Sequence, residues 1–179
     1  LYVYQKTRHH DFPEAFYQGY KGILVTDGLQ QYHMLENTIP GLVSANCWVH
    51  ARRLFFDAAK AMKKDDPDKV RCSVAYQALQ RIAAIYEIEG ALKELQPAER
   101  LGRRQSDIKP LVKEFFAWIK AKKAENAYLP KSKTSQGIEY FLNQEKYLRV
   151  FLTDGNVPMD NSASLYTGYF YPHLLSRST

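Results

Sequence analysis

The stretch Gly22-Ile23-Leu24-Val25-Thr26-Asp27-Gly28 decides the fold of this chain. Its apolar, β-branched residues are typical of a buried strand, and the Asp-Gly pair ends that strand in a turn. A second strand is predicted at 42–45 (Leu-Val-Ser-Ala), after a helix predicted over 29–36. Strand, helix and strand in this order favour two parallel strands joined by a helical crossover.

Upstream of this stretch, residues 1–5 have the composition of a strand, and residues 12–20 are predicted to form a helix or turn. Together with the segments 22–26 and 42–45, about three short strands are expected. Downstream of Cys47 the apolar residues recur at helical spacing. Four helices are predicted there: one capped by Asn46 and ended at 65–68, one reaching Gln96-Pro97, one from Ser106 and one capped by Thr134. The predicted fold class is α/β and mostly helical.

Composition sets outer limits on what the protein can be. The 179 residues are 45% hydrophobic and 25% charged, which fits one soluble domain with an insertion. The aromatic content of 13% excludes disorder over most of the length, and no apolar run reaches the ~18 residues of a membrane span. Two cysteines, Cys47 and Cys72, cannot build a disulfide framework, which favours a reducing cytoplasm.

The basic residues gather in the second half of the chain. The net charge is +6, and residues 91–149 hold 13 basic against 7 acidic residues, while residues 1–90 hold 11 against 10. Such an excess suits a polyanionic partner such as nucleic acid. A solvated helical surface is an equally good interpretation of the charge alone.

Asp27 is the sharpest single position. It follows a strand directly, and the carboxyl ends of parallel strands face the ligand crevice of an α/β sheet. A carboxylate there is a natural ligand of Mg²⁺, and Gly28 leaves room for a substrate. The alternative is a turn-forming Asp-Gly pair, or a cap for the helix starting at Leu29.

Two clusters lie at the start of the next helix. Cys47 and His50 stand three residues apart, on one helix face, and favour a structural pair. Zinc binding is the weaker interpretation because the spacing identifies no further ligands. A nucleophilic pair is also weaker, because no orienting third group can be identified. His50, Arg52 and Arg53 could together bind phosphate at a helix N-terminus. The alternative is a solvated face, with a salt bridge to Asp57.

Taken together, four segments resemble the transposases of bacterial insertion sequences in the family numbered sixty-six. They are Leu24–Tyr32, Asn46–Phe55 with its Cys-Trp-x-His-x-Arg-Arg run, Leu129–Ser132, and Asp154–Asn161. The resemblance extends from about Leu1 to Ser164. The Cys-x-x-His run and the downstream Asp160-Asn161 pair are its specific parts, whereas Asp-Gly alone is not.

The resemblance implies a ribonuclease-H-like core with a catalytic triad of two aspartates and a glutamate. It also implies two divalent metals, normally Mg²⁺, that activate the attacking group in DNA cleavage and strand transfer. Asp27 matches the second aspartate and is thus the expected catalytic and metal-binding residue. The implied domains are a partial core at 1–63, a helical insertion at 64–146, a return segment at 147–165 and an atypical tail at 166–179.

Two departures limit the expected activity. The first aspartate is expected on a strand upstream of Leu1, and Leu165 and Tyr166 occupy the positions of the family's glutamate and arginine. We therefore expect a fragment of a transposase from the bacterial cytoplasm, and we expect this chain alone to be catalytically inactive. Its expected partner is transposon-end DNA, and homo-oligomer formation is possible. The alternatives are a non-catalytic DNA- or protein-binding helical module, and a small-molecule hydrolase using Cys47 and His50.

Overall fold

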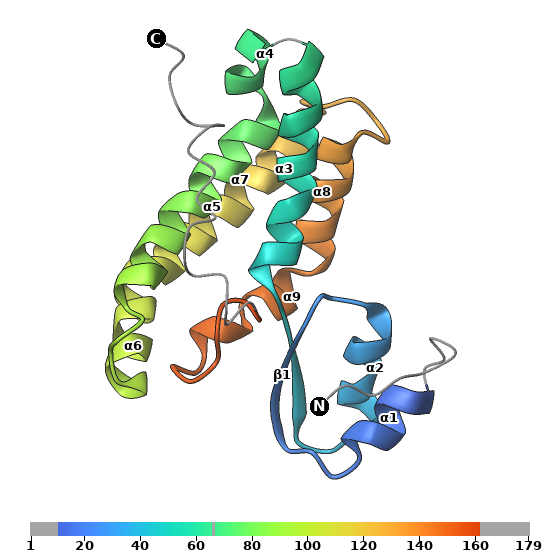
Figure 1. The fold of residues 1–179 in the computed structure, drawn as a ribbon, viewed down its shortest axis with the longest axis vertical. Helices are drawn as coiled ribbons and strands as arrows, with labels where there is room; N and C mark the ends of the chain where they lie inside the picture. The colour runs from blue at the N-terminus through green and yellow to red at the C-terminus, as the bar shows by residue number, and fades with distance from the viewer. Residues whose placement is uncertain (1–10, 66, 162–179) are drawn as a thin grey trace.

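The computed structural model describes residues 11–65 and 67–161, which form a small α/β unit and a larger group of helices (Figure 1). The α/β unit contains α1 (Asp11–Tyr17), β1 (Gly22–Thr26), α2 (Gln30–Thr38) and β2 (Leu42–Asn46). The predicted parallel pairing is confirmed, with Gly22 opposite Leu42 and Thr26 opposite Asn46. The described sheet has these two strands, and the strand predicted at 1–5 lies outside the described residues.

The remaining described residues are almost entirely helical, which confirms the mostly helical class. The helices are α3 (Trp48–Asp65), α4 (Pro67–Cys72), α5 (Val74–Ala91), α6 (Pro97–Arg103), a π-helical turn (Arg104–Ile108), α7 (Lys109–Ala124), α8 (Lys133–Asn143), α9 (Glu145–Leu148) and a 3₁₀ turn (Val150–Leu152). The long helices α3, α5, α7 and α8 lie side by side and extend away from the sheet (Figure 1).

The sheet lies between two hydrophobic cores because successive side chains of a strand point to opposite faces. Ile23 and Val25 pack against the large core of the helical bundle. Leu24, on the other face, packs against a small cluster that includes Leu35 and Leu42. Both faces of a two-stranded sheet are thus covered, which stabilises a pairing that would be marginal alone.

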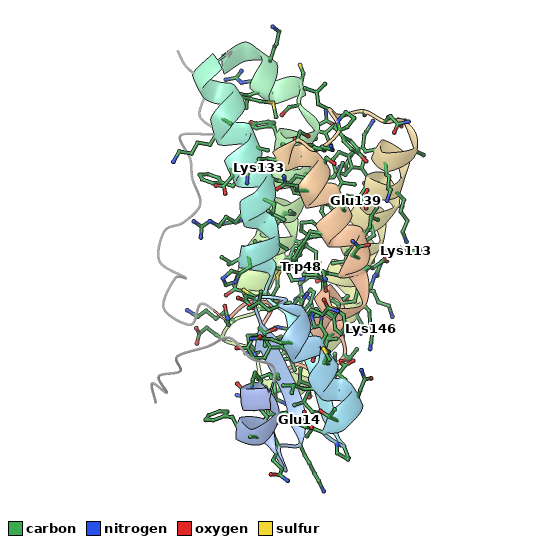
Figure 2. The ribbon with its side chains drawn as sticks, turned by 90° about the vertical axis from the view of Figure 1, so that its right-hand side faces the viewer. Glu14, Trp48, Lys113, Lys133, Glu139 and Lys146 are labelled. Atoms are coloured by element: carbon green, nitrogen blue, oxygen red, sulfur yellow. The ribbon has the colours of Figure 1, made fainter. Side chains whose placement is uncertain are left out.

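Trp48 lies where the α/β unit meets the helical bundle (Figure 2). Its side chain is fully buried, and the indole N–H donates to the main-chain oxygen of Leu148 at 2.8 Å. The rings of Phe115, Phe141 and Phe151 surround it at centroid distances of 5.7 to 6.0 Å. This one residue therefore joins the first helix after the sheet to the end of the chain's helical region.

Two helix boundaries differ from the prediction. The helix expected to reach Gln96-Pro97 ends at Ala91, and it begins only after Ser73, whose side chain accepts the N–H of Tyr76 at 3.2 Å. The helix expected from Ser106 does not begin there, because Ser106 lies inside a π-helical turn that continues α6 and leads directly into α7.

Two predicted caps are also wrong. Ser132, rather than Thr134, caps α8 by accepting the N–H of Ser135 at 3.1 Å, and Thr134 is buried within the first turn. Asn46 is not the cap of α3, since its side chain is engaged by α2 and by the connection between α8 and α9.

Candidate functional site

The carboxyl edge of the sheet brings together residues from both strands. Asp27 follows β1 and Cys47 follows β2. Thr26 and Asn46 are the last paired residues, and the N–H of Cys47 donates to the Thr26 oxygen at 2.8 Å. Parallel strands end at the same edge of their sheet, so the residues that follow them share one small surface.

Asp27 begins a tight turn in which its own carboxylate takes part. One carboxylate oxygen accepts the N–H of Leu29 at 3.3 Å, and the N–H of Gly28 donates to the Thr26 hydroxyl at 3.3 Å. Gly28 has φ of +86°, a conformation that favours glycine. The side chain of Asp27 is half-buried, and helix α2 begins at Gln30 without a side-chain cap. Asp27 therefore forms an Asx turn, not a helix cap.

A polar network from α8 and α2 supports this edge. Tyr140 of α8 donates its hydroxyl to the main-chain oxygen of Asp27 at 3.1 Å. The Asn46 amide donates to Gln144 at 3.1 Å, and its oxygen lies 2.8 Å from Nε2 of His33. Burial, followed by the charge of Asp27, raises the pKa of Tyr140 to about 12. Sequence reasoning missed Tyr140, Asn46 and Gln144 as site residues.

The structure also brings Cys47 together with Asp160 and Asn161, which lie more than 110 residues later. Cys47 is fully buried and its Sγ accepts the N–H of Asn161 at 3.5 Å. Burial raises the pKa of the thiol, and the charge of Asp160 acts in the same direction, while the amides of Asn161 and His50 oppose them. A buried thiol with a raised pKa is a poor nucleophile.

The three predicted DNA-binding residues differ in exposure. His50 is exposed, and so is the side chain of Arg53, with 76% of its surface accessible and a 4.0 Å contact to Asp57. Arg52 is half-buried, with its guanidinium 5.4 Å from the centre of the Tyr86 ring. Burial, and then the charge of Asp160, raises the pKa of Tyr86, which Arg52 opposes.

A buried ion pair holds the loop that leads to Asp160. Arg104, in the π-helical turn, pairs with Glu89 of α5, and both side chains are almost inaccessible. One Arg104 nitrogen also donates to the main-chain oxygens of Phe151, Asp154 and Val157 at 2.8 to 2.9 Å. The segment that carries Asp160 and Asn161 thus depends on a residue that sequence reasoning did not select.

Similarity to known proteins identifies the family of this chain. The model of the Transposase IS66 family matches residues 1–164. The chain belongs to the IS66 transposase family. The match spans the strand edge with Asp27, the start of α3 and the return loop with Asp160 and Asn161.

One curated relative of this IS66 chain is an uncharacterized protein, y4hP, of Sinorhizobium fredii (strain NBRC 101917 / NGR234). The two are 30% identical over 172 residues, which cover 92% of this chain and 31% of the relative. The chain therefore spans about a third of the length of that relative. No solved structure matches the chain. Leu165 and Tyr166 lie outside the described residues.

IS66 transposases of the DDE type use Mg²⁺, a hard cation that prefers oxygen ligands. Asp27 offers one carboxylate oxygen pair at the strand edge. No group of three or more histidine, cysteine, aspartate or glutamate side chains in residues 11–65 and 67–161 could hold a metal ion. Mg²⁺ is usually bound through one or two carboxylates, and an ion held by Asp27 would take its other ligands from water, from phosphate or from groups outside the described residues.

None of the described helices is both long and apolar enough to cross a membrane.

Proposed function

We propose that this chain is part of the catalytic core of an IS66 transposase, whose activity is metal-dependent DNA cleavage and strand transfer. In this proposal β1, α2 and β2 belong to a ribonuclease-H-like core, and Asp27 is one of its catalytic, metal-binding carboxylates. The observation that carries the proposal is the position of Asp27 at the carboxyl edge of a parallel strand pair. The Cys47 and Asn161 contact at the same edge supports it.

We propose further that transposon-end DNA contacts the start of α3 in the bacterial cytoplasm. His50 and Arg53 are exposed on this helix, close to the strand edge, where their N–H groups can reach phosphate. Arg52 belongs to the same proposed surface, but its guanidinium lies over Tyr86 and contributes mainly to the support of the helix.

A salt titration of DNA binding tests this surface. The dissociation constant for a short duplex is measured by fluorescence anisotropy over a range of salt concentrations. Each phosphate contact contributes about −0.9 to the slope of log K against log salt. Arg53→Gln should therefore flatten the slope by roughly one. Arg81→Gln is the matched control, because Arg81 already pairs with Glu114 and should leave the slope unchanged.

Two results would contradict the DNA-contact proposal. Equal slopes for Arg53→Gln and the unsubstituted chain would remove the α3 surface from DNA binding. An absence of binding at low salt would remove DNA as a partner of this chain and favour the alternative, a protein-binding helical module.

We propose that the chain alone does not cleave DNA, because Asp27 is the only carboxylate that the described residues place directly after a strand. Supercoiled plasmid incubated with the purified chain and Mg²⁺ should stay uncut, as it should with Asp27→Asn. Nicking that depends on both Mg²⁺ and Asp27 would show that the chain is a competent nuclease.

A further inference from the structure

Tyr140 belongs to helix α8 of the bundle and contacts the carboxyl edge of the sheet. It lies 113 residues after Asp27 in the sequence. Its hydroxyl donates to the main-chain oxygen of Asp27 at 3.1 Å. The next residue, Gly28, lies so close that a Cβ there would overlap the Tyr140 hydroxyl. The peptide that follows Asp27 is therefore in direct contact with α8.

The helix that carries Tyr140 is firmly held. Helix α8 packs closely against α3, where Gly137 leaves just enough room for the ring of Phe55. Phe141 stacks on that ring with centroids 5.5 Å apart, and Tyr140 meets Phe141 edge-on at 6.3 Å. Close-packed interiors permit little side-chain displacement, so the Tyr140 hydroxyl occupies a fixed point relative to the bundle.

The turn is restrained from its other side as well. The N–H of Gly28 donates to the Thr26 hydroxyl, and the N–H of Leu29 donates to the Asp27 carboxylate. The peptide between Asp27 and Gly28 carries both the oxygen that accepts from Tyr140 and the Gly28 N–H. The next peptide, which carries the Leu29 N–H, is joined to it through Cα of Gly28. Fixing the first peptide therefore limits the movement of the donor to the Asp27 carboxylate.

We propose that Tyr140 is a positioning residue, whose hydroxyl holds the peptide after Asp27 and thereby keeps the Asp27 carboxylate in one orientation. The inference rests on the catalytic role proposed for Asp27. The helical segment 64–146, which contains Tyr140, would then help to orient the proposed catalytic carboxylate of Asp27.

The test compares Tyr140→Phe, which removes the hydroxyl and keeps the ring, with the unsubstituted chain. Three-bond NMR couplings from the backbone nitrogen and carbonyl carbon to Cγ of Asp27 report its χ1 rotamer. We expect one staggered rotamer in the unsubstituted chain and averaged couplings in Tyr140→Phe. Tyr147→Phe is the matched control, since it also removes a tyrosine hydroxyl, and the Tyr147 ring stacks on His33 of α2 in the same part of the molecule.

Unchanged Asp27 couplings in a folded Tyr140→Phe variant would overturn the proposal, and so would rotamer averaging in the unsubstituted chain. Averaging in Tyr147→Phe as well would show a general loosening in place of a specific contact. The measurement needs neither DNA nor metal. A negative result in DNA binding would therefore count against the proposed DNA surface and leave this result intact.

Discussion

At the scale of single residues, Arg104 shows how a buried charge organises a loop. In the sequence it is one of two adjacent arginines in a basic region, with no pattern to distinguish it from Arg103. In the fold, Arg104 is 1% exposed and Arg103 55% exposed at the side chain. The partners of Arg104 lie 15 to 53 residues away, so no local signal could have revealed its role.

Replacing Arg104 should be strongly destabilising. Arg104→Met leaves the Glu89 carboxylate buried without its partner, and breaking such a pair costs about 3–5 kcal/mol. The free energy of unfolding in urea measures the loss. Arg103→Met is the control, since its pair with Asp107 is exposed to solvent and should contribute little to stability.

If the loss reflects an unpaired charge, adding Glu89→Gln to Arg104→Met should recover part of it. Equal losses for the Arg103 and Arg104 variants would show that the buried pair has no special role.

Some residues of the candidate site could be selected from the sequence, and others, like Arg104, could not. Asp27 could be selected from the sequence because it follows a strand, and Cys47 and Asn161 because they belong to motifs. Tyr140 could not be selected. It lies in a stretch whose apolar spacing predicts only a buried helix face, and its hydrogen bond to Asp27 depends on how α8 packs against α3.

At the scale of elements, periodicity predicts that a helix exists better than it predicts where the helix begins. Ser132 and Thr134 are both residue types that cap helices. The choice between them depends on which side chain is free to turn back, and Thr134 is 5% exposed beneath the first turn of α8. That burial is a tertiary property, so the sequence pattern could not distinguish the two.

The cap of α8 can be tested directly. Ser132→Ala should lower the free energy of unfolding by about 1 kcal/mol, because the N–H of Ser135 then loses its partner. Thermal or urea unfolding monitored by circular dichroism would measure it. Ser135→Ala keeps the capping bond to its own main chain, so the same loss in both variants would contradict the assignment.

At the scale of the whole molecule, charge counting overstated the basic surface. Residues 91–149 carry most of the excess, but two of their cations pair with carboxylates outside this segment. Lys146 contacts Glu36 of α2 at 2.7 Å, and the buried Arg104 pairs with Glu89 of α5. The positive charge available to a partner is therefore smaller there than the sequence indicates, and the exposed residues of α3 gain relative weight.

The stability of the whole chain should fall at alkaline pH. Burial raises the pKa of Tyr140 to about 12 and raises those of Tyr86 and Tyr17. Unfolded tyrosines ionise near pH ~10, so above that pH the unfolded state releases protons that the folded state retains. The stabilisation is complete below about pH 10 and is lost as the pH rises toward 12.

Urea midpoints measured from about pH 8 to 12 would follow this loss. Tyr140→Phe should reduce the dependence, because it removes one of the three groups. A dependence identical in both proteins would rule out Tyr140 as a contributor.

The contacts at the strand edge join residues that are far apart in the sequence. This separation affects when the site can form during synthesis of the chain. The turn at Asp27 is completed by Tyr140, and Cys47 is completed by Asn161, 114 residues later. A ribosome delivers the two strands well before these partners, and closing so long a loop is slow. Until Phe115, Phe141 and Phe151 have been made, Trp48 at the start of α3 lacks the rings that surround it, and the turn at Asp27 lacks Tyr140. Chains interrupted within the helical bundle should therefore be retained by chaperones or degraded, without ever presenting a formed site.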